Sequence, residues 1–154
     1  KIEKKISDIL DTLEIIRENL PESAESLGAL GLIKDGLYKK VEFAIESLID
    51  ICSIINVGLR LGVPETEDGL ISNIEKNKVL DEKAVQIIKE MKRFRNVLVH
   101  KYGDIDDVKA YNSISSGLDD FEAVITEIEK FLERHKKSDN EKLKKQPSKV
   151  HKKT

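Results

Sequence analysis

Residues 37–59 read LYKKVEFAIESLIDICSIINVGL, a segment whose apolar side chains follow the repeat of an α-helix. Two apolar stripes run along it, one through Leu37, Val41, Ala44, Leu48, Ile51 and Ile55, and one through Tyr38, Ile45, Cys52 and Leu59. A helix with two stripes must bury both of its flanks against neighbours. The segment is therefore predicted to be the central helix of the fold, capped by Asp35 and ended by residues 58–62 and Pro64.

Three further long helices are predicted from the same kind of spacing. They cover residues 2–20, ended by Pro21, residues 81–103, capped by Asp81, and residues 118–132. Shorter pieces are expected at 27–33, as a short helix or an ordered loop, and at 70–74. No segment alternates with the two-residue period of a strand. The predicted fold class is all-α, an up-and-down helical bundle of four to five main helices.

The composition fits one soluble domain with a single core. The chain has 154 residues, 36% of them charged and 39% hydrophobic. Its lone Cys52 excludes an intramolecular disulfide, and three histidines form no cluster with zinc spacing, so neither a metal nor a cofactor is expected. No run approaches about 20 apolar residues, so we expect no membrane span and no signal peptide. These features favour a reducing, cytoplasmic setting.

The charge is unevenly distributed along the chain. Residues 134–154 contain nine Lys or Arg against two acids, a net charge of +7, and the whole chain carries −2, which leaves −9 for residues 1–133. We therefore expect a helical domain over residues 1–133 and a basic, disordered tail over residues 134–154, because the tail is too polar to offset its ordering entropy by burial. The tail is either a solubilising terminus or a contact for RNA or a partner.

One polar constellation stands at the end of a predicted helix. Residues 93–102 read RFRNVLVHKY, which places two arginines, an amide, an imidazole and a phenol close together. Arg95 occupies a position that the helical pattern reserves for an apolar side chain, so its charge requires a partner. The sequence has no glycine-rich phosphate loop, no Gly-x-Ser-x-Gly motif and no metal-binding set, so this run is the main candidate for chemistry.

Helical geometry relates these side chains to one another. Arg95 and Tyr102 are seven positions apart and share a face of a regular helix, whereas His100 points about 140° away from Arg95. If the helix tightens or unwinds near Val99, His100 can turn toward Arg95 and form a shared cleft. The alternative is that His100 interacts with the helix C-terminus while Arg95 pairs with an acid.

The run Arg95, His100, Tyr102 resembles the R-x4-H-x-Y motif of the HepT-like toxins, a branch of the HEPN ribonuclease superfamily. Four segments are similar to that branch in the family's order, namely residues 41–52, 60–66, 94–106 and 118–122. The resemblance covers about residues 2–132 and leaves the basic tail outside it. The Arg/His spacing by itself is a weak signal, and the four segments carry most of the similarity.

The resemblance implies a homodimeric helical toxin that cleaves RNA without a metal and pairs with a minimal nucleotidyltransferase antitoxin. It implies Arg95 and His100 as the catalytic residues, and Tyr102 as the residue that the partner adenylylates. The chemistry is compatible, because a guanidinium binds phosphate and an imidazole moves protons near neutral pH. A second copy at a two-fold interface would supply the second acid or base that cleavage needs.

Three other side chains are candidate substrate contacts, namely Arg93, Asn96 and Lys101. Asn96 has two possible roles: it orients the phosphate or His100, or it is an ordinary amide on the helix surface. Tyr102 also has two: it is the modified residue, with a possible auxiliary catalytic part, or it is a packed tyrosine at the helix end. The sequence is also compatible with a second, noncatalytic function. The acidic body repels RNA, which favours a noncatalytic interaction module that its partner enzyme modifies, whereas the basic patch of Lys92, Arg93, Arg95 and Lys101 favours a ribonuclease.

Overall fold

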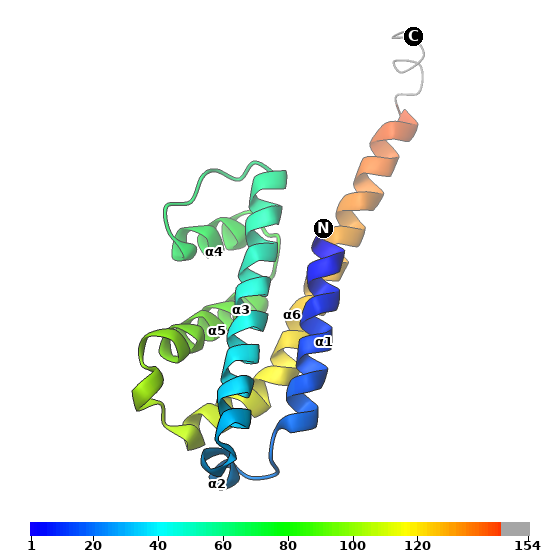
Figure 1. Ribbon diagram of the computed structural model, residues 1–154. Coiled ribbons are helices and arrows are strands. Elements are labelled where there is room, and N and C mark those ends of the chain that lie inside the picture. Colours follow the sequence, from blue (N-terminus) through cyan, green and yellow to red (C-terminus); the bar gives the residue numbers. More distant parts are fainter. Residues whose placement is uncertain (146–154) are drawn as a thin grey trace.

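The computed structural model describes residues 1–145, with side chains through Lys137. Its helices are α1 (Ile2–Asn19), α2 (Ala24–Leu27), α3 (Leu32–Gly58), α4 (Glu67–Lys76), α5 (Glu82–His100) and α6 (Asp107–Lys145), with the 3-10 turns η1 (Gly28–Leu30) and η2 (Tyr102–Asp104). None of the described residues forms a strand, which confirms the predicted all-α class (Figure 1). In the same range, no helix is both long enough and apolar enough to cross a membrane.

The central helix of the bundle is α3, as its two apolar stripes predict. It packs against α1, and it also packs against α4 and α5 (Figure 1). Both stripes are buried, with Leu48 and Ile51 fully covered and Ile45 and Cys52 at 1% exposure. Burial raises the pKa of the Cys52 thiol to about 12, so this cysteine is a packed apolar side chain rather than a nucleophile.

The start of α3 differs from the prediction. The helix begins at Leu32, after Gly31 with a positive φ of 57°, and Asp35 lies inside its first turn instead of capping it. Leu32 is 87% exposed and Ile33 is 51% exposed. Because these residues do not continue a buried stripe, the apolar pattern could not locate the true start of the helix, and the carboxylate of Asp35 is left available for another contact.

Aspartate and threonine caps begin the two helices that carry the candidate site. The Asp81 carboxylate accepts a hydrogen bond from the Ala84 N–H at 2.8 Å, as predicted for α5. The Thr66 hydroxyl accepts one from the Gly69 N–H at 3.0 Å at the start of α4. Each cap satisfies an N–H group that a helix start leaves unpaired.

Removing the Asp81 cap should destabilise the fold modestly. We expect Asp81→Ala to lower the free energy of unfolding by about 1 kcal/mol, because the first turn of α5 then loses its hydrogen-bond acceptor. Urea unfolding followed by circular dichroism measures this change. Asp81→Asn keeps an acceptor and should stay close to the wild type; an equal loss in both variants would show that capping is not the cause.

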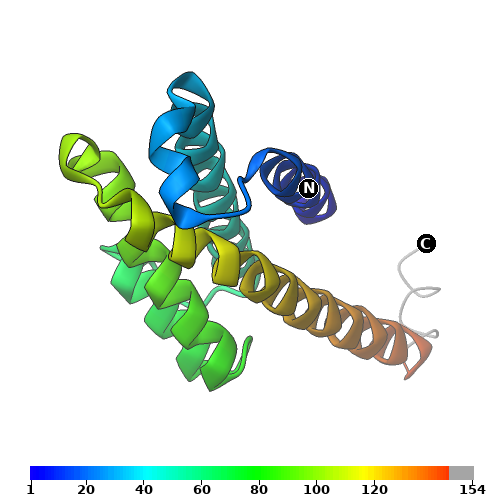
Figure 2. The ribbon, with the colours of Figure 1, turned by 90° about the horizontal axis from the view of Figure 1, so that it is seen from below.

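The last helix, α6, is longer than the predicted 118–132. It begins after Asp106, whose carboxylate accepts hydrogen bonds from the N–H groups of Val108 and Lys109, and it continues to Lys145. Its first half is held by buried side chains at Ala110, Ile114, Leu118 and Phe121. Helix α6 extends beyond the other helices (Figure 2).

The helix also crosses the predicted boundary after residue 133. Residues 134–145 are helical, whereas the sequence suggested a tail without fixed structure; lysine and glutamate are good helix formers, so the segment extends a helix that packing has already nucleated. Residues 146–154 lie outside the described residues. The division into a domain and a basic tail stays a prediction.

Candidate functional site

Helix α5 carries most of the predicted site residues on its last two turns. It remains an α-helix through His100, without the unwinding near Val99 that a shared cleft would need. In a regular helix Arg95 and His100 therefore point about 140° apart. A single chain does not bring these two side chains together.

Arg95 is held by an acid from another helix. Its side chain is 12% exposed, and both terminal nitrogens of its guanidinium donate to the Glu67 carboxylate in the first turn of α4, the longer bond measuring 3.3 Å. Its Nε donates to Asn96 Oδ1 at 3.1 Å. Glu67 and Asn96 therefore already occupy the N–H groups with which this guanidinium would bind an anion bidentately. The ion pair matches the alternative in which Arg95 pairs with an acid.

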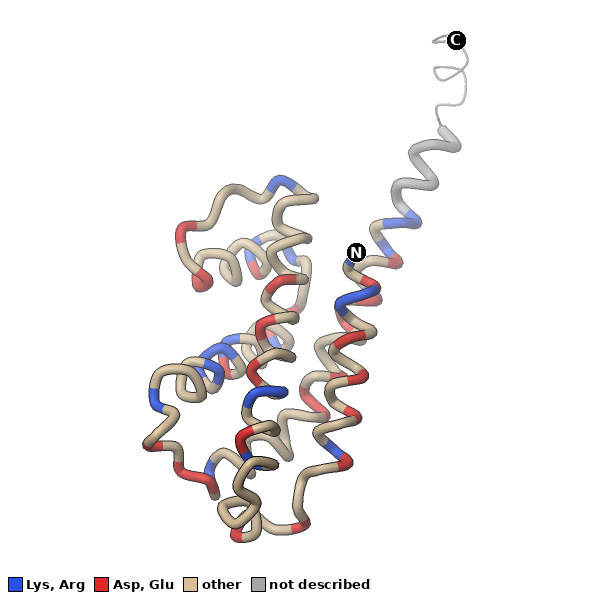
Figure 3. The backbone as a smooth tube through the Cα atoms, in the orientation of Figure 1, with Lys and Arg blue, Asp and Glu red and all other residues tan. Residues whose placement is uncertain are grey.

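A second ion pair joins α5 to the same turn of α4. Lys92 Nζ lies 2.6 Å from an Asp68 carboxylate oxygen, and this hydrogen bond lowers the pKa of Asp68. Lysines and arginines gather on α5, while acidic residues recur along α3 and at the start of α4 (Figure 3). Within the predicted basic patch, Lys92 and Arg95 are therefore neutralised by α4, and Arg93 and Lys101 remain exposed.

An exposed face of α5 carries the imidazole together with a different arginine. Arg93, Val97 and His100 are spaced i, i+4 and i+7, which places them on one side of the helix, and all three are exposed. This shared face was not predicted from the sequence, because the helical pattern followed there is that of the buried stripe containing Arg95. The spacing itself was the signal that could have revealed it.

Tyr102 lies beyond the end of α5, in η2. Its side chain is 47% exposed, and its hydroxyl donates a hydrogen bond to Asp35 Oδ1 on α3. This bond raises the pKa of the Tyr102 phenol to about 12. Tyr102 thus contacts α3 while Arg95 contacts α4, so the predicted shared face of the two residues is wrong. The reason is that the regular helix ends at His100 and the chain turns.

A buried tyrosine supports the ring of Tyr102. The rings of Tyr38 and Tyr102 meet edge to face, with centroids 6.3 Å apart and an interplanar angle of 87°. Tyr38 donates to Asp107 at 2.6 Å, and Lys34 pairs with the same carboxylate at 3.1 Å. Burial raises the pKa of Tyr38, and the hydrogen bond from Tyr38 lowers that of Asp107. These partners could not be predicted from the sequence, because the residues that meet are 64 or more positions apart, 64 being the separation of Tyr38 and Tyr102.

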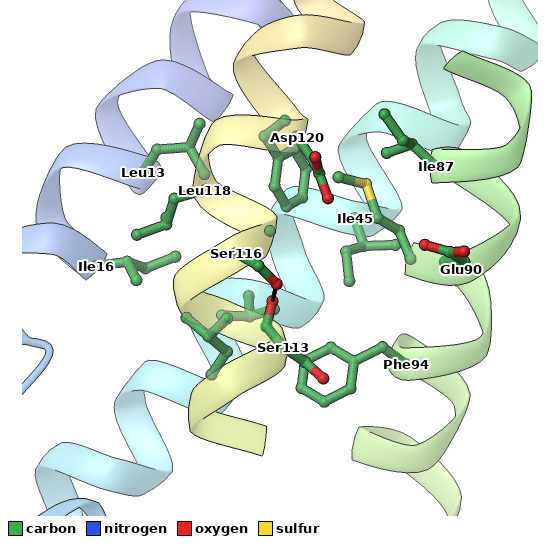
Figure 4. A pocket seen from close by; sticks show the side chains of 15 residues that line it. Leu13, Ile16, Ile45, Ile87, Glu90, Phe94, Ser113, Ser116, Leu118 and Asp120 are labelled. Carbon is green, nitrogen blue, oxygen red and sulfur yellow. Dashed lines mark hydrogen bonds between the residues drawn. The ribbon is translucent and has the colours of Figure 1, made fainter. Parts of the chain in front are cut away.

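An apolar pocket of about 140 Å³ lies on another side of α5, between α1, α3 and α6 (Figure 4). Ile87, Met91 and Phe94 line it from α5, with the carboxylates of Glu90 and Asp120 among its polar groups. Neither Arg95 nor His100 contributes to its lining. Among the described residues, no group of three or more His, Cys, Asp or Glu side chains is arranged to hold a metal ion.

The fold is that of an all-α helical bundle, and its sequence matches a known protein family. A family model described as "Ribonuclease HepT-like" matches residues 9–128. The chain therefore belongs to the HepT-like ribonuclease family. It is similar to the mRNA nuclease HepT of Shewanella oneidensis strain MR-1, with 25% identity over 96 residues, which covers 62% of this chain and 72% of the relative.

Solved structures show the same fold. A toxin–antitoxin complex with AMP-PNP aligns with a TM-score of 0.76 and 22% identity, covering 83% of this chain and 96% of the other. A tri-AMPylated Shewanella oneidensis HEPN toxin in complex with its MNT antitoxin aligns with a TM-score of 0.76 and 23% identity, over the same shares. YutE, a cytosolic protein of unknown function from Bacillus subtilis, aligns with a TM-score of 0.73 and 21% identity, covering 88% and 90%.

Proposed function

We propose that this chain is the toxin of a toxin–antitoxin pair, a metal-independent endoribonuclease that acts in the cytoplasm and is silenced when a partner nucleotidyltransferase adenylylates Tyr102. The observation that carries the proposal is the run of Arg95, His100 and Tyr102 inside the segment 9–128 that matches the ribonuclease family. The exposure of His100, Arg93 and Lys101 on the end of α5 supports it, because substrate must reach these groups.

Cleavage would proceed by attack of the ribose 2′-hydroxyl on the adjacent phosphorus. The bond from this oxygen to phosphorus forms, the bond to the 5′-oxygen breaks, and the products carry a 2′,3′-cyclic phosphate and a 5′-hydroxyl. His100 takes or gives a proton, and arginine binds the phosphate charge as it develops. Arg95 is the catalytic arginine of the proposal, and Arg93, Asn96 and Lys101 are its substrate contacts.

A homodimer would complete this site. Exposed apolar side chains gather around the end of α5 and the neighbouring starts of α3 and α6, namely Leu32, Ile33, Val97, Val99, Tyr102 and Val108. A two-fold contact through this end would cover them and bring a second His100 close. The two His100 side chains would then serve as acid and base at one phosphate. This arrangement does not require Arg95 and His100 of one chain to meet, and in a single chain they point apart.

The dimer is testable by its mass. We expect light scattering at micromolar concentration to give about twice 17.5 kDa, because an interface that covers these apolar side chains removes them from water. Val97→Glu should shift the chain toward the monomer, whereas Val57→Glu, at an exposed position on the far end of α3, should not. A monomeric wild type would remove the composite site.

Glu67 should compete with RNA phosphate for Arg95. In a His100→Ala background that keeps the RNA intact, we expect Glu67→Gln to tighten RNA binding about five- to tenfold at low salt, since Arg95 loses the carboxylate that neutralises it. Fluorescence anisotropy with a labelled RNA measures the Kd. Glu65→Gln makes the same charge change at an exposed residue of the preceding loop and should alter the Kd much less. Equal effects would mean that only net charge matters.

The proposed activity is tested with the purified chain, a single-stranded RNA and EDTA. Cleavage that persists in EDTA and leaves cyclic phosphate ends supports the metal-independent ribonuclease. A chain that leaves RNA intact but accepts AMP from its partner would instead be a noncatalytic interaction module. The ion pair of Arg95 with Glu67 favours that second candidate, because it leaves Arg95 without free charge in the isolated chain.

A further inference from the structure

The contact between Tyr102 and Asp35 joins two parts of the chain that no sequence motif connects. Asp35 lies in the first turn of α3, is exposed, and accepts a hydrogen bond from the Tyr102 hydroxyl. The edge contact with Tyr38 fixes the ring of Tyr102 on one side. The ring position and the direction of the O–H bond are therefore both set by α3.

The charged groups around Asp35 differ from those around its neighbour Asp107. Among residues 1–137, whose side chains the structure describes, no lysine or arginine forms an ion pair with Asp35, whereas the neighbouring Asp107 is paired with Lys34 and bonded by Tyr38. The hydrogen bond to Asp35 raises the pKa of Tyr102 to about 12. The phenol thus keeps its proton at neutral pH, and it becomes a strong nucleophile only if a base removes that proton during reaction.

Space for a reacting group lies beside the hydroxyl. Asp35 and Tyr102 line an open hollow of about 360 Å³ between α3 and the end of α5, together with Lys39. The Lys39 ammonium is exposed and pairs with Glu42 at 2.8 Å. Glu42 lines the same hollow, so an entering phosphate would have to displace the Glu42 carboxylate before it could bind the Lys39 ammonium.

We propose that Asp35 is a catalytic base for the adenylylation of Tyr102, supplied by the chain that is modified rather than by the enzyme that modifies it. The inference rests on the proposed function, in which a partner nucleotidyltransferase brings ATP to Tyr102. In the step, Tyr102 Oη bonds to the α-phosphorus of ATP, and the bond from that phosphorus to the bridging oxygen breaks. Pyrophosphate leaves with the electron pair, and the phenol proton passes to the Asp35 carboxylate and then to water.

A role of Asp35 as a base also accounts for its position in the exposed first turn of α3. Asp35 does not cap α3, and the exposed first turn that carries it buries no apolar side chain. The carboxylate therefore serves no visible structural purpose apart from its bond to Tyr102. A base at this place would be in position before the partner arrives, so the partner would need to position only ATP.

The test measures AMP transfer to the full chain by its partner nucleotidyltransferase with Mg²⁺ and ATP, as initial rates on the peptide that contains Tyr102. We expect Asp35→Asn to lower kcat about 100-fold or more with little change in the KM for the chain, since asparagine accepts the hydrogen bond but takes no proton. Asp35→Glu should restore much of the rate. Asp104→Asn removes an exposed carboxylate two residues from Tyr102 and is the matched control, expected within about threefold of wild type.

The pH profile separates a base from a residue that only orients the phenol. The wild-type rate should vary little from pH 7 to 9, whereas the Asp35→Asn rate should rise about tenfold per pH unit as phenolate forms. An Asp35→Asn variant with wild-type kcat, or with a reduced kcat and an unchanged profile, would overturn the inference. A wild-type chain that accepts no AMP on Tyr102 would overturn the proposed silencing as well, so the two failures are distinguishable.

Discussion

His100→Ala should abolish RNA cleavage and growth toxicity while leaving the fold intact. The imidazole is exposed at the end of α5, so its loss costs little stability. If it transfers the proton of the 2′-hydroxyl or of the leaving oxygen, we expect the cleavage rate to fall about 10²- to 10⁴-fold. Cleavage of a labelled RNA, at matched protein concentration and helicity, measures the effect.

The second histidine of the described chain is the matched control. His135 is exposed on α6, outside residues 9–128, and its ring stacks on Phe131. His135→Ala should therefore cleave RNA at the wild-type rate. A similar loss in both variants would mean that general changes of charge or solubility, and not an imidazole at the site, cause the defect.

Substitutions at Arg95 test the arginine of the same site. Arg95→Ala should also abolish cleavage, and Arg95→Lys should fail because a point charge cannot replace the planar fork that binds phosphate. Arg95 also joins α5 to α4 through Glu67, so stability must be measured beside activity. Full toxicity of a folded Arg95→Ala or His100→Ala variant would favour the noncatalytic interaction module.

The fold could be predicted from the sequence to the extent that side-chain burial is periodic. The two stripes of α3 fixed its central position, because only neighbours on both flanks could cover them. The start of α3 could not be predicted in this way, because Leu32 and Ile33 are apolar but exposed, and neither could the continuation of α6 past Leu132, where residues 133–137 are exposed. The position of such helix ends depends more on the helix propensity of the local residues, and on the extension of a helix already formed, than on burial.

For the candidate site, the sequence predicts some properties of single residues but not the contacts between helices. The misfit of Arg95 in an apolar stripe correctly predicted that its charge needs a partner, but Glu67 lies 28 positions earlier, and only the packing of α4 on α5 brings it there. Asp35 and Tyr102 are 67 positions apart and meet for the same kind of reason. Sequence spacing predicts which side chains share a helix face, whereas contacts between helices depend on the packing of the whole bundle.

Tyr102→Phe should escape silencing and stay toxic in the presence of the partner. The wild-type chain, incubated with the partner nucleotidyltransferase, Mg²⁺ and ATP, should gain the mass of one or more AMP units on the peptide that contains Tyr102 and lose RNA cleavage. The substitution removes only the hydroxyl and keeps the ring contact with Tyr38, and the exposed Asp35 that loses its donor can turn to water. We therefore expect no AMP incorporation and no loss of stability.

The position of the hydroxyl indicates how the modification would act. AMP on Tyr102 would project beside Asp35 and Lys39 rather than onto Arg95, because Tyr102 contacts α3. Its negative charge and bulk would stand two residues beyond His100, where they would repel and obstruct an approaching RNA phosphate. Tyr111→Phe is the control, since it removes a tyrosine hydroxyl that donates to the Pro21 carbonyl and should still be silenced. If Tyr102→Phe is still modified, the acceptor lies elsewhere; if it is unmodified yet harmless, Tyr102 takes part in RNA cleavage together with Arg95 and His100.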